Sequence, residues 1–268
     1  MSVARALLDA RDAARQLPTL TGADPSFSLD EAYAVADEIR RLRIARGERS
    51  RGYKIGFTNR GIWARYGVFA PIWGPVWDTT VEDAADGEAT VSLAPFCEPR
   101  LEPEIMFGFA RPPSPGQGLD ALVGCIEWIA HGFEIVHTHF ADWRFAAADT
   151  VADFALHGRL FVGARVLVAR FGASGREVAA ALAAVRVTLC CDGVDVEEGR
   201  ADIVLDGPLQ ALRQWIDAMA AQPQHWPIAA GDIVSTGTIT DAAPMRAGQL
   251  WQTRLDDDRL QAMTLRTA

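Results

Sequence analysis

The stretch Arg100-Leu101-Glu102-Pro103-Glu104-Ile105-Met106-Phe107 decides the fold and points to the chemistry of this chain. Its apolar residues predict a β-strand, and alternate side chains of a strand point to the same face. Glu102, Glu104 and Met106 therefore share one face. The opposite face carries Leu101, Ile105 and Phe107. Two carboxylates aimed at one spot call for a positive charge between them, and oxygen ligands favour hard cations such as Mg²⁺ or Mn²⁺.

A solvated face is the alternative explanation, in which both glutamates lie in water on an edge strand, as most charged residues do. A third acid weighs against this alternative. Glu134 lies in residues 132–137, a run that is short and apolar around that acid. Strand alternation puts Glu134 beside Val136. Three acids that are each embedded in an apolar run are harder to explain by solvent exposure.

Several motifs follow one another in an order and spacing that cover most of the chain. They are Tyr53-Lys54-Ile55-Gly56-Phe57-Thr58, Arg100-Leu101-Glu102-Pro103-Glu104-Ile105, Phe133-Glu134-Ile135, Asp142-Trp143-Arg144, Asp149-Thr150-Val151-Ala152-Asp153 and Gly231-Asp232-Ile233-Val234-Ser235-Thr236-Gly237. In this ordered set the chain resembles the 2-hydroxypentadienoate (2-keto-4-pentenoate) hydratases and oxalocrotonate decarboxylases of the fumarylacetoacetate hydrolase superfamily. The resemblance implies an α+β fold, a fumarylacetoacetate hydrolase-like mixed β-roll or sandwich with an N-terminal helical segment. It also implies that Glu102, Glu104 and Glu134 hold the metal, Mg²⁺ or Mn²⁺.

Lys54, Asp78 and Thr236 are candidate active-site residues beside the metal ligands. Lys54 precedes Gly56 in a short apolar run, so its ammonium lies either at the mouth of a pocket or on the surface. The resemblance implies an active-site lysine here, which would transfer a proton or stabilise an anion. It also implies that Asp78 lies near the substrate as a paired base that orients water, although a lone aspartate in a turn is more often a helix or turn cap. At Thr236 it implies a contact to the substrate carboxylate.

One loop departs from the family pattern. The family usually carries Asp-Asn-Ala-Ser where this chain reads Asp153-Phe154-Ala155-Leu156-His157. The change removes an amide and a hydroxyl from a substrate-facing loop. We expect Phe154 and Leu156 to form an apolar wall, and His157 or Arg159 to meet a distal carboxylate or carbonyl of the substrate. Such a pocket should favour a longer or substituted chain over the five-carbon dienoate.

The composition is that of an ordinary globular enzyme, with 49% apolar and 23% charged residues among 268. A formal net charge of -9 argues against nucleic acid or an anionic membrane as a partner, because both select basic surfaces. The charged N-terminal region and the lack of an apolar run of roughly 18 residues lead us to expect a cytoplasmic protein. Without metal-type spacing, four cysteines are expected to be reduced thiols: Cys97, Cys125, Cys190 and Cys191.

The chain is expected to divide into an N-terminal helical segment, residues 1–50, and a catalytic domain, residues 51–268. Residues 2–17 predict an amphipathic helix. The capping box Ser28-Leu29-Asp30-Glu31 opens a second helix that should end near residue 46. The other expected elements are a helix over 208–222 and strands over 53–57, 89–93, 100–109, 133–138, 160–168, 185–191, 232–236 and 250–255.

The chemistry implied by the resemblance is metal-assisted hydration. A cation held by three glutamates would polarise a 2-oxo or 2-hydroxy-dienoate and stabilise its enolate. We expect a hydratase of 2-hydroxypenta-2,4-dienoate or a related 2-oxo-alkenoate in aromatic compound catabolism. The alternatives are a 4-oxalocrotonate-type decarboxylase, an acylpyruvate C–C hydrolase and a non-catalytic metal-binding partner protein. The resemblance further implies a homo-oligomer, and a complex with another enzyme of the pathway stays open.

Overall fold

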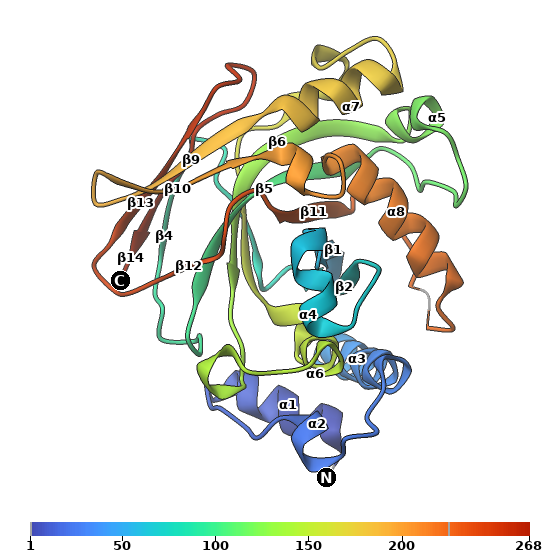
Figure 1. The fold of residues 1–268 in the computed structure, drawn as a ribbon, viewed down its shortest axis with the longest axis vertical. Helices are drawn as coiled ribbons and strands as arrows, with labels where there is room; N and C mark the ends of the chain where they lie inside the picture. Colours follow the sequence, from blue (N-terminus) through green and yellow to red (C-terminus); the bar gives the residue numbers. More distant parts are fainter. Residues whose placement is uncertain (1, 225) are drawn as a thin grey trace.

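Two β-sheets with helices around the larger one make up the described chain (Figure 1). A computed structural model describes residues 2–224 and 226–268. Within them the larger sheet has nine strands, of which seven form a continuous path. In spatial order these are β2 (Ile72–Trp77), β1 (Ser50–Gly56), β11 (Ile233–Thr238), β5 (Arg100–Phe109), β6 (Ile126–Val136), β7 (His157–Val162) and β3 (Val81–Asp83). The mixture of helices and strands confirms the expected α+β class.

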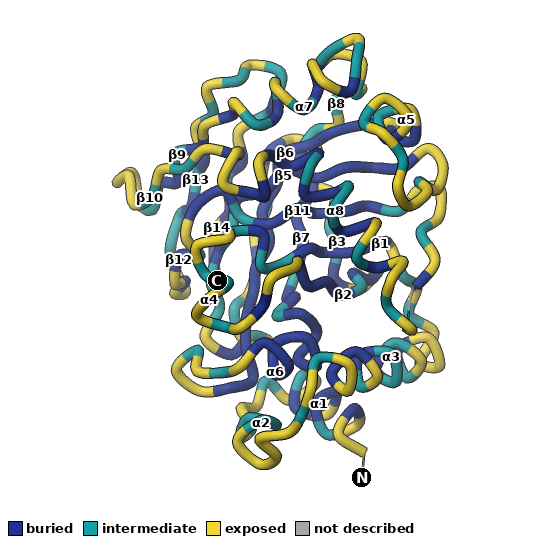
Figure 2. The backbone as a smooth tube through the Cα atoms, turned by 45° about the vertical axis from the view of Figure 1, so that its right-hand side comes forward, coloured by how far each residue is buried: buried dark blue, intermediate teal, exposed yellow. Residues whose placement is uncertain are grey.

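Strand β5 lies inside the larger sheet, between β11 and β6, and it is antiparallel to both. Two short strands complete this sheet: β12 (Ala243–Pro244) pairs with β5, and β8 (Val166–Leu167) pairs with β6. Figure 2 shows the central strands as mostly buried. Because β5 has a hydrogen-bonded neighbour on each side, its glutamates do not lie on an exposed edge.

The smaller sheet packs against one face of the larger sheet. Its order is β10 (Val194–Arg200), β9 (Arg186–Cys191), β13 (Leu250–Leu255), β14 (Thr264–Thr267) and β4 (Glu88–Val91). An apolar cluster joins the two sheets, with Leu101 and Ile135 from the larger sheet and Leu189 and Trp251 from the smaller one. This face of β5 is therefore filled by core residues, and the glutamates point to the other face.

Helices cover the remaining surfaces. The N-terminal helices α1 (Val3–Asp12), α2 (Leu20–Ala23) and α3 (Leu29–Ala45) lie at the bottom of Figure 1, next to α6 (Ala147–Ala152). The others are α4 (Trp63–Tyr66), α5 (Leu119–Val123), α7 (Gly175–Ala184) and α8 (Pro208–Ala221). One core cluster contains Leu7 and Tyr33 from the N-terminal helices together with Phe107 of β5 and Trp215 of α8. None of the described helices combines the length and apolar character needed to cross a membrane.

The capping box is confirmed. Ser28 Oγ accepts the Glu31 N–H at 3.3 Å, and the Glu31 carboxylate accepts the Ser28 N–H at 2.8 Å. The first helix is shorter than the expected 2–17, because Ala14 takes a positive φ of 46° that a helix cannot continue. The chain then turns so that the Leu17 N–H donates to the His139 carbonyl.

Most expected strands are confirmed in position. The run 160–168 is divided between β7 and β8, and the expected strand at 133–138 is the end of the longer β6. Five strands were not expected: β2, β3, β10, β12 and β14. The four cysteines are free thiols, as expected. The division of the chain at residue 50 stays a prediction.

Candidate active site

Three glutamates meet on one face of the larger sheet. Glu102 on β5 lies directly opposite Glu134 on β6, and Glu104 lies opposite Gly132. Side chains of directly paired residues project from the same face, and strand alternation brings Glu104 to it as well. One carboxylate oxygen from each glutamate lies within 4.8 Å of the others. The alternative of a solvated edge strand is wrong, because Glu104 and Glu134 are fully buried.

Burial makes these carboxylates costly to ionise. It raises the pKa of Glu102 to about 7 and that of Glu134 above its usual value, although the Lys54 ammonium opposes both shifts. The pKa of Glu104 rises well above its usual range because of burial and its two acidic neighbours. Among the described residues, Glu104 Oε1 and Glu134 Oε2 have no hydrogen-bond partner. An all-oxygen set with unpaired, repelling oxygens fits a hard divalent cation.

A backbone amide of β11 holds the second oxygen of Glu104. The Gly237 N–H donates to Glu104 Oε2 at 2.8 Å. Gly237 has a φ of 101°, and a Cβ atom there would lie 2.0 Å from the Thr58 hydroxyl oxygen. This position therefore needs glycine for both its backbone conformation and its close approach to Thr58.

Lys54 lies in the same site, so the alternative of a surface lysine is wrong. Its side chain is buried, and its Nζ atom donates to the Ala155 carbonyl at 3.1 Å and lies 3.4 Å from Glu134 Oε2. Burial alone would lower the pKa of Lys54, but the three glutamates outweigh burial and raise it. Lys54 is also the only lysine in the sequence, which otherwise uses arginine for its positive side chains.

The loop that departs from the family pattern has an unusual backbone. Phe154, Ala155 and Leu156 have positive φ angles of 56°, 51° and 64°. Left-handed backbone at consecutive non-glycine residues is strained, and such strain tends to occur at functional sites. The loop presents the Ala155 carbonyl to Lys54 and lines the active-site cavity with Leu156, as expected for that residue. Phe154 instead packs its ring under the Arg11 guanidinium, 4.7 Å from the ring centroid, and does not join the cavity wall.

His157 does not face the cavity, contrary to its expected contact with the distal part of the substrate. It is buried behind Glu134, with Nδ1 2.8 Å from Glu134 Oε1 and Nε2 2.8 Å from the Thr80 hydroxyl. Burial, followed by nearby cationic side chains, lowers the pKa of His157 well below its usual value. Arg159, the other residue expected there, pairs with Glu82 outside the cavity wall.

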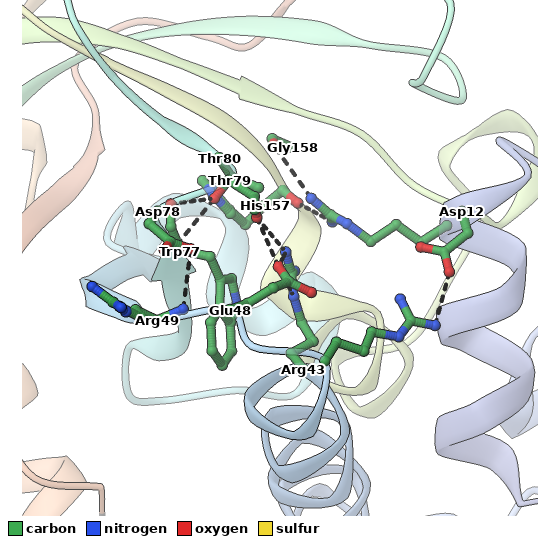
Figure 3. A network of polar contacts seen from close by, with 12 residues as sticks. Asp12, Arg43, Glu48, Arg49, Trp77, Asp78, Thr79, Thr80, His157 and Gly158 are labelled. Atoms are coloured by element: carbon green, nitrogen blue, oxygen red, sulfur yellow. Dashed lines mark hydrogen bonds and ion pairs between the residues drawn. The ribbon is translucent and has the colours of Figure 1, made fainter.

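Asp78 and Thr236 also lie elsewhere than expected. Asp78 is exposed, and its carboxylate accepts the Arg49 N–H at 3.0 Å (Figure 3). This bond joins the end of β2 to the residue before β1, so Asp78 is not a local turn cap, and Asp78 does not line the cavity beside Glu102. The Thr236 hydroxyl is buried and donates to the Ile105 carbonyl at 2.9 Å, so it is turned away from a substrate.

A cavity of about 540 Å³ leads to the glutamates. Its inner wall includes Lys54, Glu102 and Leu156. Further residues line both this cavity and a shallow surface hollow beside it, and so form its outer part: Arg65, Tyr66, Trp143 and Phe145. Arg100 also lines the cavity, with its guanidinium 4.1 Å from the Trp143 ring centroid. The outer cavity therefore combines aromatic rings with two positive charges.

None of these outer residues was expected in the site from the sequence, although Arg100 and Trp143 belong to the motifs that carry the family resemblance. Arg100 carried a usable signal, because it lies two positions before Glu102 and strand alternation puts both on one face. Arg65 carried no signal in the sequence. It lies on the short helix α4, and no local pattern predicts that this helix reaches the cavity.

Comparison with known proteins gives close relatives over nearly the whole chain, although no family model matches it. The chain is 30% identical over 248 residues to 4-oxalocrotonate decarboxylase of a Pseudomonas species, covering 92% of this chain and 90% of that protein. It is 29% identical over 244 residues to 2-hydroxyhexa-2,4-dienoate hydratase of Comamonas testosteroni, covering 90% and 88%.

Solved structures agree. The fold matches 4-oxalocrotonate decarboxylase from Pseudomonas putida G7, complexed with magnesium and adipate, with a TM-score of 0.87 and 27% identity over 99% of this chain and 96% of that chain. A fumarylpyruvate hydrolase from Pseudomonas aeruginosa shares the fold at a TM-score of 0.62 and 14% identity, covering 81% and 89%. The chain belongs to the 2-keto-4-pentenoate hydratase and 4-oxalocrotonate decarboxylase family. It shares its fold with the fumarylpyruvate hydrolase.

We predict that Gly237→Ala destabilises the protein by roughly 1–3 kcal/mol or more, because its Cβ atom would clash with Thr58. Chemical denaturation measures the change. Gly231→Ala is the matched control: Gly231 has a φ of 87°, but a Cβ there meets no described atom within 4 Å. Equal losses in the two variants would contradict close packing of β11 on Thr58.

A second prediction concerns pH in the metal-free protein. Glu104→Gln should raise the free energy of unfolding, and the gain should be larger at pH 8 than at pH 5. Near pH 5 the buried Glu104 carboxyl is largely protonated, since its pKa is raised, and it resembles the neutral amide. The stability contributed by the protonated acid is lost as the pH rises through the folded-state pKa, whereas glutamine keeps it.

Thermal melts at the two pH values in the presence of a chelator measure this difference. Excess Mg²⁺ should reverse the order of stability at pH 8, because the variant has lost a ligand and gains less from binding. A gain that is the same at both pH values, or larger at pH 5, would show that Glu104 is not a buried acid.

Proposed function

We propose that this chain is a divalent-metal-dependent lyase that hydrates 2-hydroxypenta-2,4-dienoate or a related 2-oxo-alkenoate in aromatic compound catabolism. One observation carries the proposal: three glutamates cluster beside the only lysine of the chain, and Glu102 and this lysine line a cavity of about 540 Å³. Membership of a family whose relatives are named as hydratases and decarboxylases supports the same reaction class.

We propose Mg²⁺ or Mn²⁺ as the cofactor, held by Glu102, Glu104 and Glu134. Glu104 Oε1 and Glu134 Oε2 have no hydrogen-bond partner among the described residues, which supports this assignment, as does the magnesium complex of the relative from Pseudomonas putida G7. A bound cation would polarise the 2-oxo or enol oxygen of a substrate and offset the charge of its enolate. The family fold and the carboxylate set thus lead to the same chemistry.

The role proposed for Lys54 is proton transfer to or from the carbon framework of the substrate. Its ammonium is fixed by the Ala155 carbonyl and by Glu134, so it cannot follow solvent as a surface lysine does. Leu156 and Val136 add apolar wall to the same cavity. Fixed geometry of the ammonium favours acid–base catalysis.

A second candidate function is decarboxylation of a 2-oxo-enedioate. Arg65 and Arg100 in the cavity wall favour it, because guanidinium groups bind a second carboxylate well. A metal at the same site would serve as the electron sink. The bond to a carboxylate would break and release CO₂, whereas hydration adds water to the substrate. Acylpyruvate C–C hydrolysis and a non-catalytic role remain outcomes of the substrate test below.

We predict that Lys54→Met lowers kcat by about a hundredfold or more while the protein still folds, since methionine keeps the apolar stem and removes the proton donor. Steady-state kinetics with a dienoate substrate and a thermal melt measure the two effects. Lys54→Arg is the comparison variant, because arginine keeps the charge and does not release its proton. Near-normal kcat in either variant would contradict proton transfer by Lys54.

A panel of substrates separates the candidate functions. Unsubstituted and alkyl-substituted dienoates, 2-oxo-enedioates and an acylpyruvate are supplied with Mg²⁺. Loss of the dienoate absorbance, release of CO₂ and cleavage of the acylpyruvate are all recorded. Arg100→Gln should raise KM for dicarboxylates by roughly tenfold or more and leave monocarboxylates almost unchanged. Arg159→Gln serves as the control, because Arg159 lies outside the cavity wall. Turnover of no compound in the panel would favour the non-catalytic role.

A further inference from the structure

We propose that His157 is a positioning residue that fixes the Glu134 carboxylate so that a single oxygen, Oε2, is presented to a metal ion. This inference rests on the proposed function, because it concerns the same metal site. It adds a residue that touches neither the cavity nor the proposed cation. It also gives a reason for a buried imidazole directly behind the glutamate cluster.

The two oxygens of Glu134 have different surroundings. Oε1 lies 2.8 Å from His157 Nδ1. Oε2 has no hydrogen-bond partner among the described residues and lies 3.4 Å from the Lys54 ammonium, in an ion pair without hydrogen-bond geometry. His157 therefore binds Oε1 on the side away from the cavity. Oε2 has no hydrogen bond and can bind a cation.

The Thr80 hydroxyl has a second acceptor within reach, the Trp77 carbonyl at 3.3 Å. With Glu134 ionised, as a ligand of a cation would be, and with a neutral ring, the hydrogens around His157 take one arrangement. An ionised carboxylate only accepts hydrogen bonds, so Nδ1 carries the hydrogen that points to Glu134. The other nitrogen of a neutral ring, Nε2, then accepts, and the Thr80 hydroxyl 2.8 Å away donates to it. The Thr80 oxygen in turn accepts the Trp77 N–H at 3.1 Å. The chain of bonds runs from the backbone of β2 to the carboxylate and sets its rotation.

The backbone at His157 is also held by hydrogen bonds. The Arg11 guanidinium on α1 donates to the His157 carbonyl at 2.7 Å and to the Gly158 carbonyl at 3.2 Å. Figure 3 shows Thr80, His157 and Gly158 together in this network, above the end of α3. The N-terminal helix thus fixes the start of β7, and β7 places the imidazole against Glu134.

The experiment is calorimetric titration of Mn²⁺ into the substrate-free, full-length protein. His157→Leu should weaken Mn²⁺ binding by roughly 10- to 100-fold, as loss of a partner that orients a metal ligand does. His157→Asn places an amide N–H near the position of Nδ1, so it should restore the affinity to within about threefold. The electron paramagnetic resonance spectrum of bound Mn²⁺ should change in His157→Leu and return in His157→Asn.

His131→Leu is the matched control. His131 is equally buried, with Nδ1 3.0 Å from the Glu104 carbonyl and Nε2 3.0 Å from the Thr253 hydroxyl, but it does not touch a carboxylate oxygen. Its loss should lower thermal stability and leave the Mn²⁺ affinity within about threefold. Equal weakening in the two leucine variants would mean that His157 acts only through general stability, and would overturn the proposal.

Thr80→Val and Thr80→Ser decide the question if His157→Leu does not fold. Valine removes the hydroxyl that donates to the ring, so it should weaken Mn²⁺ binding severalfold, whereas serine should retain the affinity. Unchanged affinity in a folded His157→Leu or Thr80→Val overturns the positioning role while the proposed function stands. Absence of Mn²⁺ binding by the unaltered protein overturns both the metal site and this inference.

Discussion

Repulsion among three clustered carboxylates, two of them fully buried, is the constraint on which the rest of this structure depends. Glu102 and Glu104 on β5 and Glu134 on the neighbouring β6 share one face of the larger sheet. Burial raises the pKa of each of these carboxyl groups. Such a cluster keeps its geometry only if several contacts from the surrounding fold hold the side chains in place. Interior strand pairing supplies part of that rigidity, and close contacts from other elements supply the rest.

Two of the glutamates are held by hydrogen bonds from different parts of the chain. The Gly237 amide binds Glu104, and the His157 ring binds Glu134. Lys54 offsets part of the negative charge of the glutamates. The strained Phe154–Leu156 segment binds this lysine, because the Ala155 carbonyl accepts a hydrogen bond from its ammonium. The N-terminal helices contribute at a distance, since Arg11 holds the start of β7. The catalytic face is thus assembled from segments that are far apart in sequence.

Much of the fold and the metal site could be predicted from local pattern. Alternation along one strand correctly put Glu102 and Glu104 on one face, and the capping box correctly placed the start of α3. The errors lie where alternation fails. Thr236 falls in the part of β11 where the pairing register shifts, between Ser235 and Thr238, so its side chain is buried against Ile105 instead of facing substrate.

The loop after Asp153 misled the prediction for a similar reason. Three consecutive left-handed residues reverse the directions expected for an extended chain, so Phe154 and His157 point away from the cavity while Leu156 points in. Asp78 resembled a catalytic acid only by its segment, and no local pattern reports that its turn lies on the surface. Contacts such as Thr80 with His157 join residues far apart in sequence, which no single motif contains.

The most direct measurement is the anomalous scattering of Mn²⁺ in crystals of the protein soaked with this ion. We predict one strong peak that lies about 2–2.5 Å from a carboxylate oxygen of each of Glu102, Glu104 and Glu134. We further predict that the Glu134 oxygen nearest the peak is the one that does not contact His157. A peak at another position, or none at saturating Mn²⁺ with the three carboxylates still clustered, would contradict this prediction.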